Sequence, residues 1–106
     1  MIALLMLAAA ITPATFVTGN ALSEGPCGHN PDRGPCGLYV VGVYDTLDLL
    51  QQAKLIRKSI CLPPGASVGE MTDVFIKYLY DHPEGRHSDG ATLVWTSLRT
   101  AFPCPK

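Results

Sequence analysis

The chain has 106 residues, and its 8 Lys and Arg against 9 Asp and Glu give a formal net charge of -1. This length is typical of one small domain and too short for several. The near-neutral charge argues against a nucleic-acid partner, which would require a strongly basic surface.

The first segment of the chain is apolar. Residues 1–11 read Met-Ile-Ala-Leu-Leu-Met-Leu-Ala-Ala-Ala-Ile, and the first ionisable side chain is Glu24. A membrane helix needs about 20 apolar residues, so this run is too short to span a bilayer but matches the apolar core of a secretion signal. Thr12 and Ala14 are small enough to precede a cleaved bond, which predicts a signal peptide over residues 1–14, export to the periplasm and one mature domain over residues 15–106.

Two features qualify or support this interpretation. No Lys or Arg precedes the apolar run, so an upstream start, a poor signal or a buried first helix stays open. The chain has four cysteines, all after residue 14, and this even number is consistent with disulfide formation outside the cytoplasm.

The middle of the chain alternates between irregular and helical patterns. Residues 16–22 can form a short helix, whereas residues 25–35 are rich in Gly and Pro and do not favour regular structure. Beyond Gly37, apolar side chains recur every three or four residues as far as Ile60, which predicts one long amphipathic helix. Gly42 within it predicts either a close helix contact or a later helix start.

Three cations, Lys54, Arg57 and Lys58, follow near the expected end of that helix. There they would oppose the negative pole of the helix dipole. The segment Leu62-Pro63-Pro64-Gly65 then ends the helix, because proline has no amide donor and clashes with the preceding turn.

Two more helices are predicted before the C-terminus. Ser67 and Glu70 form a capping-box pattern for a helix over residues 68–81, with Asp73 and Lys77 spaced as an ion pair. Ser88 can cap a final helix over residues 89–101, which Pro103 stops. No stretch shows strand-like alternation, so we expect an all-α bundle of three or four helices stapled by disulfides.

Helix geometry favours one of the three possible cysteine pairings. The last two helices have similar lengths, so a hairpin made of them returns the chain to its starting level. Cys61 precedes the first and Cys104 follows the second, which places both at the same end of the hairpin. We therefore predict Cys61 paired with Cys104 and Cys27 paired with Cys36, whereas a zinc site would require spacings that this chain lacks.

Few residues are candidates for chemistry. Asp81, His82, Glu84 and His87 lie close together in sequence and could hold a metal or provide an acid and a base, but a polar turn that satisfies helix ends explains them more simply. Disulfide-bonded cysteines are not nucleophiles, and no nucleophile-elbow motif is present. We expect no catalytic, metal or cofactor site. Tyr80 falls off the buried stripe and is a candidate exposed aromatic contact.

Several motifs in order along the chain resemble one family. They are Cys36-Gly37-Leu38-Tyr39-Val40-Val41-Gly42-Val43-Tyr44-Asp45, Cys61-Leu62-Pro63-Pro64-Gly65, His82-Pro83-Glu84 and Ala101-Phe102-Pro103-Cys104-Pro105. Together they resemble the Rap/Tai immunity family. The resemblance implies a small exported helical protein that binds and blocks a peptidoglycan amidase delivered by a type VI secretion system.

The sequence thus predicts a periplasmic, non-enzymatic immunity protein that covers the active site of an amidase effector. The hairpin tip is the expected partner-binding surface, with Tyr80, His82, Glu84, Arg86 and His87 as its residues. We expect no membrane contact after signal removal, and a homodimer stays open. The alternatives are a small helical periplasmic stress protein or chaperone, and a metal-dependent hydrolase that uses His82, Glu84 and His87.

Overall fold

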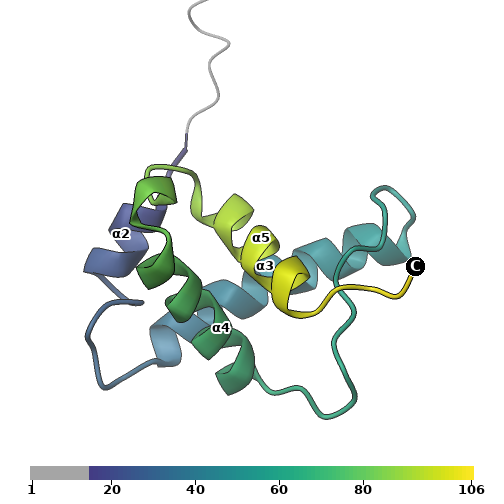
Figure 1. The fold of residues 1–106 in the computed structure, drawn as a ribbon, viewed down its shortest axis with the longest axis horizontal. Helices are drawn as coiled ribbons and strands as arrows, with labels where there is room; N and C mark the ends of the chain where they lie inside the picture. Colours follow the sequence, from purple (N-terminus) through teal and green to yellow (C-terminus); the bar gives the residue numbers. More distant parts are fainter. Residues whose placement is uncertain (1–14) are drawn as a thin grey trace, which may run out of the picture.

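The computed structural model describes residues 15–106, so the predicted signal peptide lies outside the described residues. Four α-helices follow one another along the described chain: α2 (Gly19–Glu24), α3 (Gly34–Gln52), α4 (Val68–Asp81) and α5 (Gly90–Ala101). A short 3-10 helix, η1 (Pro83–Gly85), joins α4 to α5 (Figure 1). The predicted all-α class is confirmed, because residues 15–106 contain no strand beyond one isolated bridge between Thr18 and Asp89.

In the described part of the chain, none of the helices combines the length and the apolar character needed to cross a bilayer. The α3 helix lies behind α4 and α5 and extends past them at one end of the longest axis of the molecule (Figure 1). The α4–α5 hairpin packs against it, and α2 packs against both helices of the hairpin.

The α2 helix begins later than predicted. Phe16 is 94% exposed, and the helix starts after Thr18, whose hydroxyl accepts a hydrogen bond from the Ala21 amide at 3.1 Å. Backbone hydrogen bonds then join this segment to the α4–α5 connection: the Gly19 amide donates to the Ser88 carbonyl at 3.0 Å, and the Asn20 amide donates to the Arg86 carbonyl at 2.7 Å. The start of α2 is therefore held by hydrogen bonds against the connection between α4 and α5.

The α3 helix ends at Gln52, so the prediction that it continues to Ile60 is wrong. Lys54 adopts a left-handed backbone with φ of 59°, which stops the helix without a glycine. The side-chain carbonyl of the buried Gln51 then accepts hydrogen bonds from the Ser59 amide at 2.9 Å and the Ile60 amide at 3.3 Å. Ile60 therefore lies in a loop that folds back toward α3 and places its side chain in the core. Its spacing from the apolar residues of α3 resembles a helical repeat although it lies outside the helix.

Two related expectations also fail. Lys54, Arg57 and Lys58 lie beyond the last turn of α3, so they do not oppose its dipole from within the helix. Gly42 is exposed in the middle of the helix with nothing within 4 Å of where a Cβ would stand, so neither a close contact nor a late helix start accounts for it.

The α4 helix has the predicted bounds and one of the two hydrogen bonds of the predicted capping box, because Glu70 accepts from the Ser67 hydroxyl rather than from the Ser67 amide. The Ser67 hydroxyl accepts from the Glu70 amide at 3.1 Å and donates to the Glu70 carboxylate at 3.3 Å. The Asp73–Lys77 pair is wrong: Lys77 pairs with Asp81 one turn further on. Asp73 instead pairs with Arg33, which the packing of α3 on α4 brings beside it.

The α5 helix begins one residue after its predicted start and has a different cap. The Asp89 carboxylate, and not the Ser88 hydroxyl, accepts from the Thr92 amide at 2.9 Å. Ser88 instead uses its carbonyl to bind the start of α2. An aspartate is as good an N-cap as a serine, so local sequence alone did not separate the two.

The core sits where α3, α4 and α5 meet. Its buried apolar side chains come from all four helices, from the segment between α2 and α3 and from the loop after α3, namely Leu22, Cys27, Cys36, Val40, Ile60, Met71, Phe75, Leu79, Leu93, Val94 and Leu98. Within residues 15–106, every buried side-chain nitrogen or oxygen has a hydrogen-bond partner. The core is therefore small but chemically complete.

Two disulfides close the fold with the pairing that the hairpin geometry predicts. Cys27 pairs with Cys36, and Cys61 pairs with Cys104, each with 4.9 Å between the Cα atoms. The Cys61 amide also donates to the Phe102 carbonyl at 2.9 Å. The first disulfide closes the irregular segment ahead of α3, and the second joins the two open ends of the α4–α5 hairpin.

Candidate functional site

The five predicted partner-binding residues lie together at the hairpin tip, which we define as residues 80–88. The tip comprises the last turn of α4, η1 and the entry to α5, at the end of the hairpin away from the C-terminus (Figure 1). Its position opposite the Cys61–Cys104 disulfide agrees with the sequence expectation. Partner binding by these residues stays a prediction.

Two of the five residues stabilise the tip. The His82 ring stacks on Tyr78 with 4.0 Å between centroids, and its Nδ1 lies 3.0 Å from the Tyr78 carbonyl. The Arg86 Nε donates to the Leu79 carbonyl at 2.7 Å. Arg86 thereby occupies a carbonyl that Pro83 has no amide to pair with, whereas the Tyr78 carbonyl already accepts from the His82 amide at 3.1 Å.

The other three, Tyr80, Glu84 and His87, are exposed. Tyr80 is 38% exposed, and its ring stacks on His29 from the irregular segment with 5.3 Å between centroids. The tip thus presents an aromatic surface with two anionic neighbours, Asp81 and Glu84, on a backbone that α2 and Arg86 hold in place. Sequence reasoning missed His29, because only the folded chain brings it beside α4.

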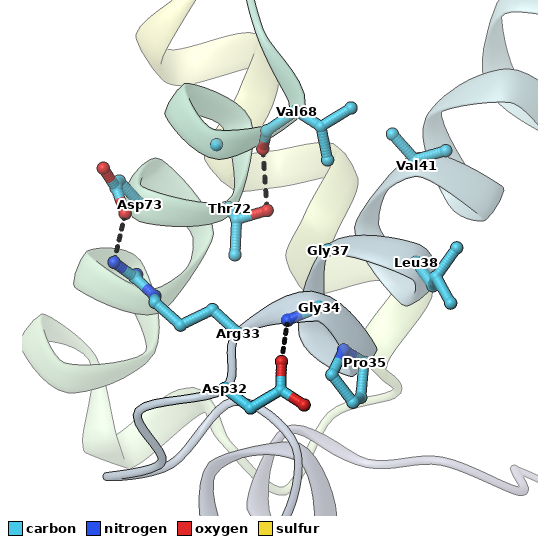
Figure 2. A pocket seen from close by; sticks show the side chains of 11 residues that line it. Asp32, Arg33, Gly34, Pro35, Gly37, Leu38, Val41, Val68, Thr72 and Asp73 are labelled. Atoms are coloured by element: carbon cyan, nitrogen blue, oxygen red, sulfur yellow. Dashed lines mark hydrogen bonds and ion pairs between the residues drawn. The ribbon is translucent and has the colours of Figure 1, made fainter.

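A second surface is an apolar groove between the start of α3 and the start of α4 (Figure 2). Its volume is about 830 Å³, and its apolar lining includes Leu38, which is 75% exposed, and Val68, which is 50% exposed. The Arg33–Asp73 ion pair borders it, joining the two helices across the groove.

Gly37 allows the two helices to meet at the floor of this groove. A Cβ there would lie 3.1 Å from the Thr72 hydroxyl and 3.3 Å from a Val68 methyl, so a larger residue would push α4 away. The Thr72 hydroxyl itself donates to the Val68 carbonyl at 2.7 Å and is satisfied within α4. The sequence did not reveal the groove, because its walls come from segments about 30 positions apart in the chain. The available signal was Leu38, an apolar residue that does not share the buried face of α3 with Val40.

The residues that the sequence offered for chemistry can each be located in the described structure. All four cysteines are in disulfides. No three His, Cys, Asp or Glu side chains in residues 15–106 lie close enough to hold a metal ion, so His82, Glu84 and His87 do not converge. The hydrogen bond from Lys77 keeps the pKa of Asp81 below its ordinary value of 3.8, so this carboxylate stays ionised and is a poor proton donor.

The described structure is a small, disulfide-bonded helical protein with an exposed hairpin tip and an apolar groove between α3 and α4. The sequence model of the Rap1a immunity proteins matches residues 18–104, which includes α2 through α5 and all four cysteines. The chain belongs to the Rap1a immunity protein family. No curated protein and no solved structure matches it significantly.

Family membership indicates an immunity protein for a secreted effector, which acts by binding a partner effector protein. The expected resemblance to the Rap/Tai immunity family is thus confirmed.

Proposed function

We propose that this protein is a periplasmic, non-enzymatic immunity protein that inhibits a peptidoglycan amidase effector of a type VI secretion system by covering its active-site cleft. The observation that carries the proposal is the family match over residues 18–104. Two disulfides in a small domain support an oxidising compartment, as does the apolar segment at residues 1–11.

The hairpin tip is the surface best suited to this task. A catalytic cleft is concave and accepts a projecting segment, and the tip is the turn at the end of a helix hairpin, whereas the α3–α4 surface is itself a groove. The tip backbone is fixed by hydrogen bonds from Gly19 and Asn20 and by the Arg86 side chain. A preordered surface loses little conformational entropy on binding, which raises affinity.

Tyr80 is the expected centre of the interface. Aromatic side chains contribute large contact areas and are enriched among the residues that dominate binding energy. Its stacking on His29 holds the ring in position before the partner arrives. Glu84 and His87 would then contribute polar contacts at the rim.

The test is inhibition of a candidate peptidoglycan amidase effector, measured on isolated peptidoglycan, together with the affinity of the purified pair. We expect Tyr80→Ala to weaken affinity about 30-fold, the effect of losing about 2 kcal/mol at a central contact. Leu38→Ser in the groove is the matched control, since it also removes an exposed apolar side chain, and it should leave affinity unchanged.

The outcomes separate the possibilities. Loss of affinity with Leu38→Ser but not with Tyr80→Ala would move the interface to the groove and refute the tip. No affinity for any amidase, combined with protection of unfolded clients, would instead favour the periplasmic chaperone. Light scattering on the free protein measures whether it forms the homodimer that the sequence left open.

A further inference from the structure

One end of the molecule concentrates positive charge. Five of the eight cationic side chains lie in the loop after α3, on the last turn of α5 or at the C-terminus, namely Lys54, Arg57, Lys58, Arg99 and Lys106, and all five are exposed. We call these five residues, together with Leu55, the basic end. No Asp or Glu occurs in residues 49–69 or 90–106, and none of the five cations makes an ion pair in the described structure.

Specific contacts bring these separate segments together. The Trp95 indole donates to the Ser59 hydroxyl at 3.0 Å, and the Arg99 guanidinium lies 5.0 Å from the centre of the Trp95 ring. The Cys61–Cys104 disulfide holds the C-terminal residues beside the same loop. The loop after α3 and the C-terminus accordingly lie at the same end of the longest axis (Figure 1).

The basic end also exposes an apolar side chain. Leu55 is 73% exposed between Lys54 on one side and Arg57 and Lys58 on the other. The left-handed conformation of Lys54 ends α3 and begins the loop that carries this leucine. An exposed leucine flanked by cations fits an interface between water and lipid headgroups, where the apolar group enters and the cations meet phosphates.

The rest of the chain carries a net negative charge. The remaining three cations stand against all nine acidic residues, and two of these cations, Arg33 and Lys77, are already in ion pairs. An anionic surface would therefore attract the basic end and repel the rest of the molecule. This polarity fixes one orientation, with the hairpin tip directed away from the surface.

From this arrangement we propose that the basic end is a reversible docking surface for an anionic phospholipid bilayer. A lipid surface fits better than an acidic protein, because protein interfaces are depleted in lysine, whereas three of these five cations are lysines without fixed partners. The proposal revises the expectation that the exported chain makes no membrane contact. It does not depend on the proposed inhibition of an amidase.

The test is cosedimentation of the disulfide-intact protein with vesicles at about 100 mM NaCl, where exposed charges still act over roughly 10 Å. Vesicles of phosphatidylcholine with phosphatidylglycerol should bind the protein, and vesicles of phosphatidylcholine alone should not. Each cation near an anionic bilayer contributes about fivefold to binding, so the double variant K54Q/K58Q should bind about 25-fold more weakly. Leu55→Ser should weaken binding about tenfold through loss of apolar insertion.

The matched control is R33Q/K77Q, which removes the same charge from the α3–α4 side of the molecule and should leave vesicle binding unchanged. All these side chains are exposed, and unchanged circular dichroism melting verifies the fold of each variant. Equal losses in both double variants, equal binding to the two kinds of vesicle, or no binding to either would overturn the proposal. Loss of effector affinity in K54Q/K58Q without vesicle binding would reassign the basic end to a protein partner.

Discussion

The two disulfides should contribute unequally to stability, because they close loops of different length. In the chain-entropy description, the stabilisation grows with the logarithm of the number of residues enclosed. A separation of 43 residues for Cys61–Cys104 gives about 4 kcal/mol, and a separation of 9 for Cys27–Cys36 gives about 2.6 kcal/mol. The expected difference of about 1.4 kcal/mol does not depend on the constant in the formula.

Direct replacement of the cysteines would confuse this comparison. Cys27 and Cys36 are both buried, so replacing them also removes packing in the core, whereas Cys61 and Cys104 are partly exposed. The cleaner design measures each disulfide in the background that lacks the other. Urea unfolding of the variant C27A/C36A, oxidised and then reduced, isolates Cys61–Cys104, and C61A/C104A isolates Cys27–Cys36 with the same side chains in both redox states.

The loop-length reasoning predicts a larger loss of unfolding free energy on reduction of C27A/C36A than on reduction of C61A/C104A. The reverse order would refute it and would show that the short disulfide acts mainly through the native state, by holding the irregular segment and His29 against the hairpin. Equal losses would mean that residual structure in the unfolded chain already closes the longer loop.

Four further predictions concern single substitutions. Hydrogen bonds from Thr92 lower the pKa of Asp89 below 3.8 in the folded protein. The ionised carboxylate therefore stabilises the fold above the unfolded-state pKa, and this stabilisation is lost as the pH falls through the folded-state pKa. The urea midpoint of the native protein should drop below about pH 4, and that of D89N should drop less steeply. In thermal melts, Gly90→Ala should destabilise by about 1–3 kcal/mol, because its Cβ would lie 2.5 Å from a tyrosine hydroxyl of α3, while Gly42→Ala, with open space, should stabilise by roughly 0.5–1 kcal/mol. Gln51→Ala should cost about 1–3 kcal/mol and speed proteolysis of the loop after α3, because two amides lose their acceptor; unchanged cleavage would contradict this assignment.

Local signals predicted the α4–α5 hairpin well. The bounds of α4 were predicted correctly at both ends. The signals were local: the N-cap at Ser67, the apolar stripe of the helix and the proline that follows His82. Matching helix lengths then brought Cys61 and Cys104 together. Both ends of α4 had a single local cause and could be placed from sequence, whereas the start of α5 offered two equivalent caps, Ser88 and Asp89, and the prediction of Ser88 is wrong.

The failures have the opposite origin. The end of α3 depends on Gln51 accepting from amides eight and nine positions later, and no local pattern distinguishes that from a continuing helix. The groove and the Tyr80–His29 stack likewise join residues distant in sequence. Of the five predicted tip residues, His82 and Arg86 stabilise the turn. The sequence could not show this, because a polar residue near a helix end can either stabilise the turn or contact a partner.

The hydrogen bonds between α2 and the hairpin tip also constrain the order of assembly. Gly19 and Asn20 pair with residues 88 and 86, so almost the whole chain must be present before the tip reaches its final form. A chain that ends before residue 86 would leave both amides without these acceptors, so the start of α2 takes its final place only after the segment ahead of α5 exists.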